Sequence, residues 1–212
     1  MYLFHRSARL GPGSAHEQMS WSLSMTEKVN QISETPVSLW TPFLSPGVNT
    51  LIWTTMVDSL STLEAANDKL LVDEGYHMLL EQGARYASTD AINDGLVQFL
   101  QLEATNVTNP PAYVSVVQAQ LAPGSYVHGI EVGLEIAQRA KAASGVDVSF
   151  AIATTGIYGQ VEWHAGYDSV EHLQRANEAL NADISFAQYL DSEVKQVYQP
   201  TGATQKVFRR LA

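Results

Sequence analysis

The chain has 212 residues, of which 45% are hydrophobic and 16% charged, and a formal net charge of −10. This composition is typical of a folded protein with a sizeable core. The absence of cysteine excludes disulfides, thiolate metal sites and cysteine nucleophiles, and the acidic balance disfavours nucleic acid as a partner. No apolar run reaches the ~20 residues that span a bilayer, and no signal-peptide pattern opens the chain. We therefore expect a cytoplasmic protein with no membrane partner.

An internal repeat organises the chain. The segment 8–14 matches 119–125, and after a one-residue deletion Trp53 and the pair Asp58-Ser59 match Trp163 and Asp168-Ser169. The shared residues fall at turns, helix caps and apolar helix positions, where a common backbone places them. We therefore predict two homologous halves, 1–103 and 112–212. A linker at 104–111 joins them, because its Asn-Pro-Pro ending cannot continue a helix or a strand.

The elements of each half follow the order β-α-β-β-α-β, which is the ferredoxin-like motif. A first strand (2–10; 113–121) ends at Pro-Gly-Ser, whose serine, Ser14 or Ser125, is placed to cap the first helix. That helix runs to about residue 33 or 143, and Gly145 stops the second copy. Two strands joined by a glycine-containing turn follow (37–44 and 49–57; 146–154 and 159–165). Ser59 or Ser169 then caps a second helix, further helix runs to about 86 or 198, and a last strand (95–102; 206–211) closes each half.

The strands carry large apolar residues on both faces, although the helices of each half cover only one face. Two copies in one chain can bury the remaining faces against each other. In element order, in the repeat and in the tryptophan of the third strand (Trp53; Trp163), the chain resembles the dimeric α+β barrel superfamily in its tandem form. The expected fold class is α+β: two tandem ferredoxin-like βαββαβ repeats packed sheet to sheet as an α+β barrel. This intramolecular pseudo-dimer leaves further homo-oligomerisation open.

The two halves differ in polarity around the third strand. Glu162, His164, Tyr167 and His172 of the second half stand where the first half has Ile52, Thr54, Val57 and Thr62. Glu162 and His164 are two residues apart on a strand and therefore share a face. A carboxylate that orients a histidine is a common acid–base pair. The alternative is an exposed or inter-half pair that forms a hydrogen bond and nothing more.

The resemblance implies that ligands bind between sheet and helices or inside the barrel. Monooxygenase-like and haem-degrading members have a polar residue on the first strand, a tryptophan ending the third and often a histidine soon after. Gln118, Trp163 and His172 occupy these positions; the alternative is a core tryptophan and an exposed helix histidine. The first half keeps Trp53, and His77 is a further residue near the expected cavity. Haem-degrading enzymes have asparagine where this chain has Gln118, which argues against that activity.

Two functions of different classes follow. One is a barrel protein of the NIPSNAP or stress-responsive type that binds a small hydrophobic or aromatic molecule, or a partner. The other is a cofactor-independent monooxygenase-like enzyme acting on an aromatic molecule, with a site lined by Trp163, His164, His172 and Gln118. In it His164 or His172 moves a proton, Glu162 orients His164, and Trp163 stacks on the substrate. Tyr167 is a further ligand-binding candidate. No cofactor is expected, with haem as a further alternative. No metal is expected either: the spacing of His128, Glu131 and Glu135 suits ligands, but a charged helix shoulder explains it.

Overall fold

The computed structural model describes residues 1–47, 49–87, 91–103, 110–200 and 203–212, so most of the expected linker at 104–111 lies outside the described residues. The chain divides into two compact units. Unit 1 comprises Met1–Leu96 and Arg209–Ala212, and unit 2 comprises Val97–Phe208. No helix of the described residues has the length and apolar character that crossing a membrane requires.

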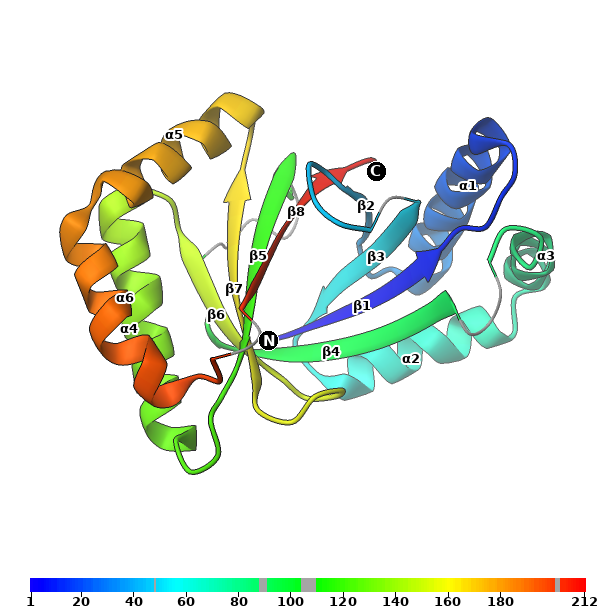
Figure 1. The fold of residues 1–212 in the computed structure, drawn as a ribbon. Coiled ribbons are helices and arrows are strands. Elements are labelled where there is room, and N and C mark those ends of the chain that lie inside the picture. Colours follow the sequence, from blue (N-terminus) through cyan, green and yellow to red (C-terminus); the bar gives the residue numbers. More distant parts are fainter. Residues whose placement is uncertain (48, 88–90, 104–109, 201–202) are drawn as a thin grey trace. The chain divides into compact units, whose positions relative to one another are not determined.

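Unit 1 contains β1 (Tyr2–Arg9), α1 (Ala15–Ser33), β2 (Val37–Pro42), β3 (Thr50–Val57), α2 (Leu60–Leu71) and α3 (Glu74–Gly83) (Figure 1). Strand β3 pairs antiparallel with both β1 and β2. The sheet residues Leu39 and Leu51 are buried in one cluster with Trp21 and Met25 of α1 and Tyr76 of α3. The helices of unit 1 therefore pack on one face of its sheet.

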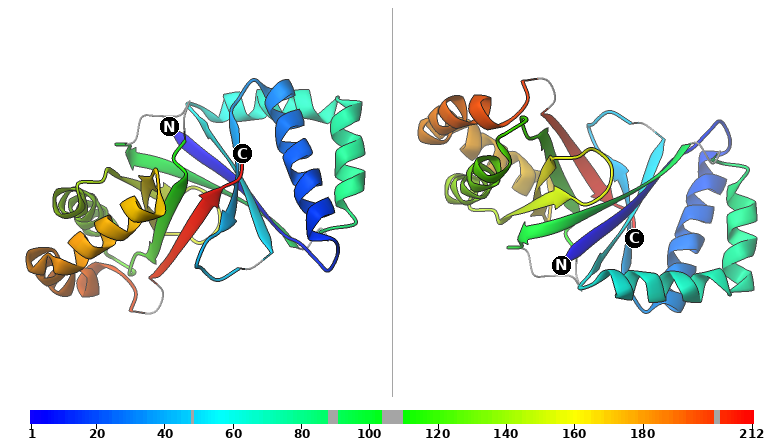
Figure 2. Two further views of the ribbon diagram at one scale, coloured as in Figure 1. Left: turned by 90° about the horizontal axis from the view of Figure 1, so that it is seen from above. Right: turned by 90° about the horizontal axis from the view of Figure 1, so that it is seen from below.

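Unit 2 repeats this order with β5 (Tyr113–Gln120), α4 (Tyr126–Ser144), β6 (Val148–Ala153), β7 (Gln160–Tyr167), α5 (Val170–Ala182) and α6 (Ile184–Val197). Strand β7 is central and antiparallel to β5 and β6. Its core joins Phe150 and Val161 of the sheet to Val132, Ile136 and Ala137 of α4. Figure 2 shows the three helices of this unit gathered on one side of its strands.

Two further strands complete the sheet order. Strand β4 (Ile92–Gln101) begins in unit 1 and ends in unit 2, and β8 (Thr204–Arg210) begins in unit 2 and ends in unit 1. The eight strands form a closed barrel in the order β1-β3-β2-β8-β5-β7-β6-β4. The expected fold class, α+β with two tandem ferredoxin-like repeats forming an α+β barrel, is confirmed. In each half the second helical region is a pair of helices, which gives βαββ(αα)β.

The helix caps follow the serine pattern with one exception. The hydroxyls of Ser14, Ser59 and Ser169 accept the backbone N–H groups of residues 17, 62 and 172 at 3.4, 3.2 and 3.1 Å. Ser125 stands at the N-cap of α4, but its side chain makes no cap hydrogen bond. Its backbone (φ −106°, ψ 20°) is not extended as at the other caps, and its hydroxyl donates instead to the Gln196 carbonyl at 3.4 Å.

Alternation along β7 gives the unit 2 sheet two different faces. Val161, Trp163, Ala165 and Tyr167 belong to the core that includes the helices. Gln160, Glu162 and His164 therefore lie on the opposite face, together with the paired residues Gln118 of β5 and Ser149 of β6. We call this second surface the polar face.

Candidate functional site

The polar face is organised around the carboxylate of Glu162, near the middle of β7. Oε1 accepts hydrogen bonds from Nε2 of Gln118 at 2.7 Å and from Nε2 of Gln160 at 2.9 Å. Oε2 lies 2.9 Å from Nε2 of His164. The side chains of Glu162 and His164 are only 4% and 13% exposed. The expectation that Glu162 and His164 share a face agrees with this geometry, and Gln118 joins them.

Strand geometry explains why these groups meet. Gln160 and His164 flank Glu162 at two residues to either side, so all three side chains leave the same face of β7. Gln118 is directly opposite Glu162 in the antiparallel pair of β5 and β7. On the other neighbouring strand, β6, the residue paired with Glu162 is the small Ala151. The carboxylate is therefore contacted by donors along its own strand and across one strand pair.

Two further residues border His164. Ser149 is its partner on β6, and the Ser149 hydroxyl accepts the backbone N–H of Glu103 at 3.1 Å. The ring of Phe99, from β4, meets the imidazole edge to face at a centroid distance of 5.4 Å. The site thus combines a buried ion-pairing group with an aromatic neighbour, and all of its residues belong to unit 2.

The hydrogen bonds decide the ionisation of Glu162. Burial by itself raises the pKa of this carboxyl, because desolvation disfavours the charged form. The hydrogen bond and charge of His164, followed by the amides of Gln118 and Gln160, outweigh that effect and lower the pKa to about 2. Glu162 is therefore an anion at neutral pH, with both oxygens occupied by donors.

This anion also constrains His164. An ionised carboxylate can only accept hydrogen bonds, so the Nε2 of His164 must carry a proton. In the neutral imidazole the other nitrogen, Nδ1, is then an acceptor. Among the described residues no hydrogen bond to Nδ1 is found, and the His164 side chain is 13% exposed. In neutral His164, Nδ1 is therefore the nitrogen that can accept a proton.

Trp163 lies on the other face of β7 and does not join this group. Its indole N–H donates to the backbone carbonyl of Gly133 on α4 at 2.8 Å. Its ring packs against Phe150 and Tyr198 at centroid distances of 5.3 and 5.6 Å. A Cβ on Gly133 would fall 2.3 Å from the Phe150 ring. The space between the sheet and α4 is thus filled at this point by packed aromatic side chains.

Tyr167 and His172 form a separate contact on the helix side. The Tyr167 hydroxyl lies 3.2 Å from that of Ser115, and its ring meets His172 edge to face at 5.6 Å. Burial raises the pKa of Tyr167, an effect that the hydrogen bond with Ser115 opposes. Two of the expected site residues therefore meet each other here, on the face opposite His164.

The two expected site residues of unit 1, Trp53 and His77, contact different partners. The indole N–H of Trp53 donates to the Thr26 hydroxyl at 2.9 Å, and its ring meets Trp21 edge to face at 6.0 Å. His77 is exposed, with Nε2 2.9 Å from the Leu71 carbonyl oxygen. Trp53 is thus part of the helix–sheet packing, and His77 binds the backbone of the preceding helix end.

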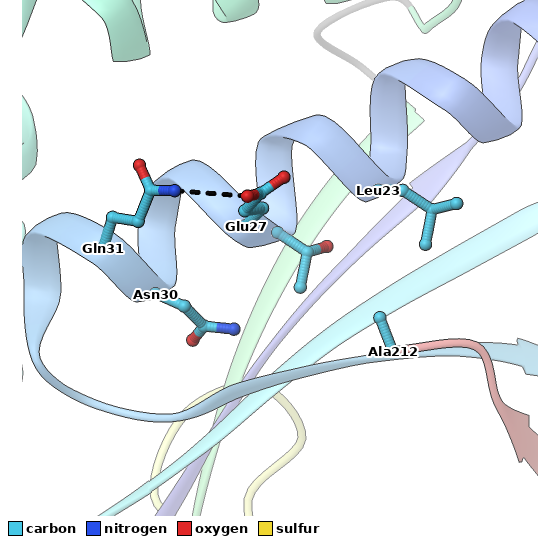
Figure 3. A pocket seen from close by; sticks show the side chains of 6 residues that line it. Leu23, Glu27, Asn30, Gln31 and Ala212 are labelled. Carbon is cyan, nitrogen blue, oxygen red and sulfur yellow. Dashed lines mark hydrogen bonds between the residues drawn. The ribbon is translucent and has the colours of Figure 1, made fainter.

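An open groove on unit 1 holds none of the expected site residues. It has a volume of about 520 Å³ and lies beside α1, where Nε2 of Gln31 donates to Oε1 of Glu27 at 3.3 Å (Figure 3). Its lining residues are Leu23, Thr26, Glu27, Asn30, Gln31 and Ala212.

Metal ligands do not converge within the described part of the chain, where no group of three or more histidine, aspartate or glutamate side chains is placed to hold an ion. His128 forms an exposed contact of 3.5 Å with Glu131, and Glu135 pairs with Arg139 at 2.7 Å. These residues act as the charged shoulder of an amphipathic helix.

Sequence reasoning missed Gln160. Its counterpart in the first half is Thr50, and a glutamine next to a turn is ordinary in any sequence. The available signal was position: Gln160 stands two residues before Glu162, on the same face of the strand.

Comparison with known proteins identifies solved structures that share this fold. No protein-family model matches the chain, and no curated protein matches it. A proposed monooxygenase from Fusobacterium nucleatum has a TM-score of 0.70 at 10% identity, covering 100% of this chain and 92% of that one. An anthrone oxidase-like protein gives 0.65 at 11% identity, with coverage of 100% and 91%. A haem-binding protein from Thermus thermophilus gives 0.54 at 11%, again with 100% and 91%.

These structures and the barrel topology show that the chain has the fold of the dimeric α+β barrel superfamily. Solved structures with this fold include proteins described as monooxygenases, as chlorite dismutases and as haem-binding. At these identities the likeness establishes the fold, and the function has to be argued from the site.

Proposed function

We propose that this protein binds a small, weakly acidic organic molecule at the polar face of unit 2, and that His164 exchanges a proton with it. The hydrogen bond between Nε2 of His164 and the buried Glu162 carboxylate carries the proposal. Burying a carboxylate is costly unless its oxygens are fully hydrogen-bonded. Three side chains meet that requirement here, and the one from His164 uses Nε2, so Nδ1 is left as the nitrogen that can act as a base.

The neighbours of His164 indicate the class of ligand. Phe99 provides an aromatic edge beside the imidazole, which favours a flat, apolar ring. Nδ1 of His164 accepts the proton of a phenolic or enolic hydroxyl on that ring. After proton transfer the ligand is an anion and His164 is an imidazolium. The imidazolium is stabilised by Glu162 on one side and by the ligand anion on the other.

A second candidate is a cofactor-independent monooxygenase-like enzyme acting on an aromatic molecule. It is favoured by the orientation of His164, because removing a proton from a ring CH₂ or hydroxyl makes an electron-rich anion that dioxygen can oxidise. In a CH₂-to-ketone reaction one oxygen atom enters the substrate and the other leaves as water. Trp163 is packed against α4, so in this proposal it supports β7 from behind and does not stack on the substrate.

Haem is less well supported. A haem between sheet and helices would need the volume that Trp163, Phe150 and Tyr198 fill. The residues at that place therefore do not fit the group.

Binding can be tested by thermal unfolding of the full chain with a panel of phenols, enols and anthrone, each alone. A ligand present at 100 times its Kd stabilises the fold by about 3 kcal/mol. We expect stabilisation of the wild type, loss of it in His164→Ala, and retention in His172→Ala, whose histidine lies on the other face. Equal stabilisation of the wild type and His164→Ala would exclude this site.

The enzyme candidate needs a second measurement. Oxygen uptake with a compound that binds should be seen in the wild type and should be abolished in His164→Ala. Binding without oxygen uptake would reject the monooxygenase-like activity for that compound class and retain the binding function.

A further inference from the structure

We propose that Gln160 is a positioning residue of the polar face: together with Gln118 it holds the Glu162 carboxylate in the one orientation that keeps the proton of neutral His164 on Nε2 and leaves Nδ1 as the base. This inference rests on the proposed role of His164 and adds a residue to it. Gln160 itself need not touch the ligand.

The backbone fixes where Gln160 stands. It is the first residue of β7, directly after a hairpin in which Gly156 and Gly159 adopt positive φ angles of 90° and 77°. The N–H of Gln160 donates to the Ile157 carbonyl at 3.1 Å, and the N–H of Leu121 donates to the Gly159 carbonyl at 2.8 Å. The turn therefore sets the start of the strand, and the side chain of Gln160 lies along it toward Glu162.

The distribution of donors over the carboxylate is uneven. Both glutamine amides donate to Oε1, at 2.7 and 2.9 Å, whereas Oε2 is left to His164. A carboxylate held by two donors on one oxygen cannot rotate without breaking both hydrogen bonds. The plane of the Glu162 carboxylate is therefore set before any ligand arrives, which is the preorganisation that a proton-transfer site needs.

The first half provides an internal comparison. The pairing of Ser7 with Ile52 across β1 and β3 is equivalent to that of Gln118 with Glu162 across β5 and β7, because Arg6–Trp53 and Val117–Trp163 are the preceding pairs. On the same alignment Thr50 and Thr54 stand for Gln160 and His164. All four positions of the network thus differ between the halves, and the first half has no carboxylate for such donors to hold.

Gln120 is a matched control. It has the same side chain, lies on the same face of the sheet and is directly opposite Gln160 in the pairing of β5 with β7. Its amide donates to the Tyr158 carbonyl at 3.4 Å and not to Glu162. Replacing Gln120 therefore tests the loss of a neighbouring amide without loss of a donor to the carboxylate.

The test uses ligand-free full-length protein, so it does not depend on finding a ligand. Two-bond ¹H–¹⁵N spectra identify which nitrogen of neutral His164 is protonated, and ¹³C spectra follow the titration of the Glu162 carboxyl. We expect Nε2 to carry the proton in the wild type. In Gln160→Leu the acid dissociation constant of Glu162 should fall about tenfold, as expected for the loss of one hydrogen bond to a charged group, and Nδ1–H should appear as a second tautomer. Gln120→Leu should match the wild type.

Two results would overturn the inference: neutral wild-type His164 protonated on Nδ1, or a Glu162 titration in Gln160→Leu that equals that of Gln120→Leu. If Gln160→Leu does not fold, Gln118→Met removes the other donor to the same oxygen and should give the same shift. The wild-type tautomer needs no variant. Failure of the ligand panel would instead count against the proposed function and would leave these spectra unaffected.

Discussion

Glu162 should make the stability of this protein depend on pH in the acid range. Its pKa is about 2 in the folded chain against an ordinary value of 4.5. Because the folded-state pKa is the lower one, ionised Glu162 stabilises the folded state at pH values above about 4.5. That contribution is lost as the pH falls toward 2. At 1.36 kcal/mol per pKa unit, the full contribution is about 3 kcal/mol.

The substitution Glu162→Gln removes this titration while keeping the shape of the side chain. Urea unfolding of both proteins between pH 6 and pH 2 gives the free energy of unfolding at each pH. The difference between wild type and variant should shrink by about 3 kcal/mol over that range, whatever its value at pH 6. The same shrinkage should persist in 0.5 M salt, which screens exposed carboxylates far more than a buried one. Two parallel pH profiles would refute the buried, hydrogen-bonded state of Glu162.

Packing and capping in unit 2 give further predictions. Gly133→Ala should lower the free energy of unfolding by about 1–3 kcal/mol, because the added Cβ overlaps the Phe150 ring and approaches the Tyr198 hydroxyl. At an open helix position the same change stabilises the fold by up to about 1 kcal/mol. An increase in the free energy of unfolding would therefore contradict the close packing of Gly133 against Phe150. Ser169→Ala should lower it by about 1 kcal/mol through loss of the α5 cap. Ser125→Ala should cost less, since its hydroxyl makes no cap bond. Urea unfolding at pH 7 measures all three, and equal costs for the two serines would contradict the difference in their backbone geometry.

The fold could be predicted from the sequence because the same local patterns occur in both halves. Pro-Gly-Ser turns, serine caps and apolar helix stripes recur in both halves, and each is set by local backbone chemistry that a sequence shows directly. Ser125 departs from this pattern because its backbone is not extended, and its hydroxyl donates to the carbonyl of Gln196, which is remote in sequence. A contact with so distant a residue leaves no local trace in the sequence.

The candidate site could be predicted only in part from the sequence. Strand alternation placed Glu162 and His164 together, and the structure adds Gln118 through the β5–β7 register. The same alternation puts Trp163 on the opposite face, although the resemblance to the superfamily grouped it with Gln118 and His172. Gln160 became visible only when the hairpin fixed the start of β7. Register and turn geometry, more than residue type, decide which polar side chains share this face.

Covalent duplication also changes how many charges such a barrel has to bury. In a dimer of two identical chains, symmetry forces every residue to occur twice, so a carboxylate on one sheet is matched by another on the second. Each would need its own set of donors to offset desolvation. In this chain Ile52 occupies the position equivalent to Glu162, so the cost arises once. A fused pair of halves can therefore hold a single ionised group where a symmetric pair would have to accommodate two.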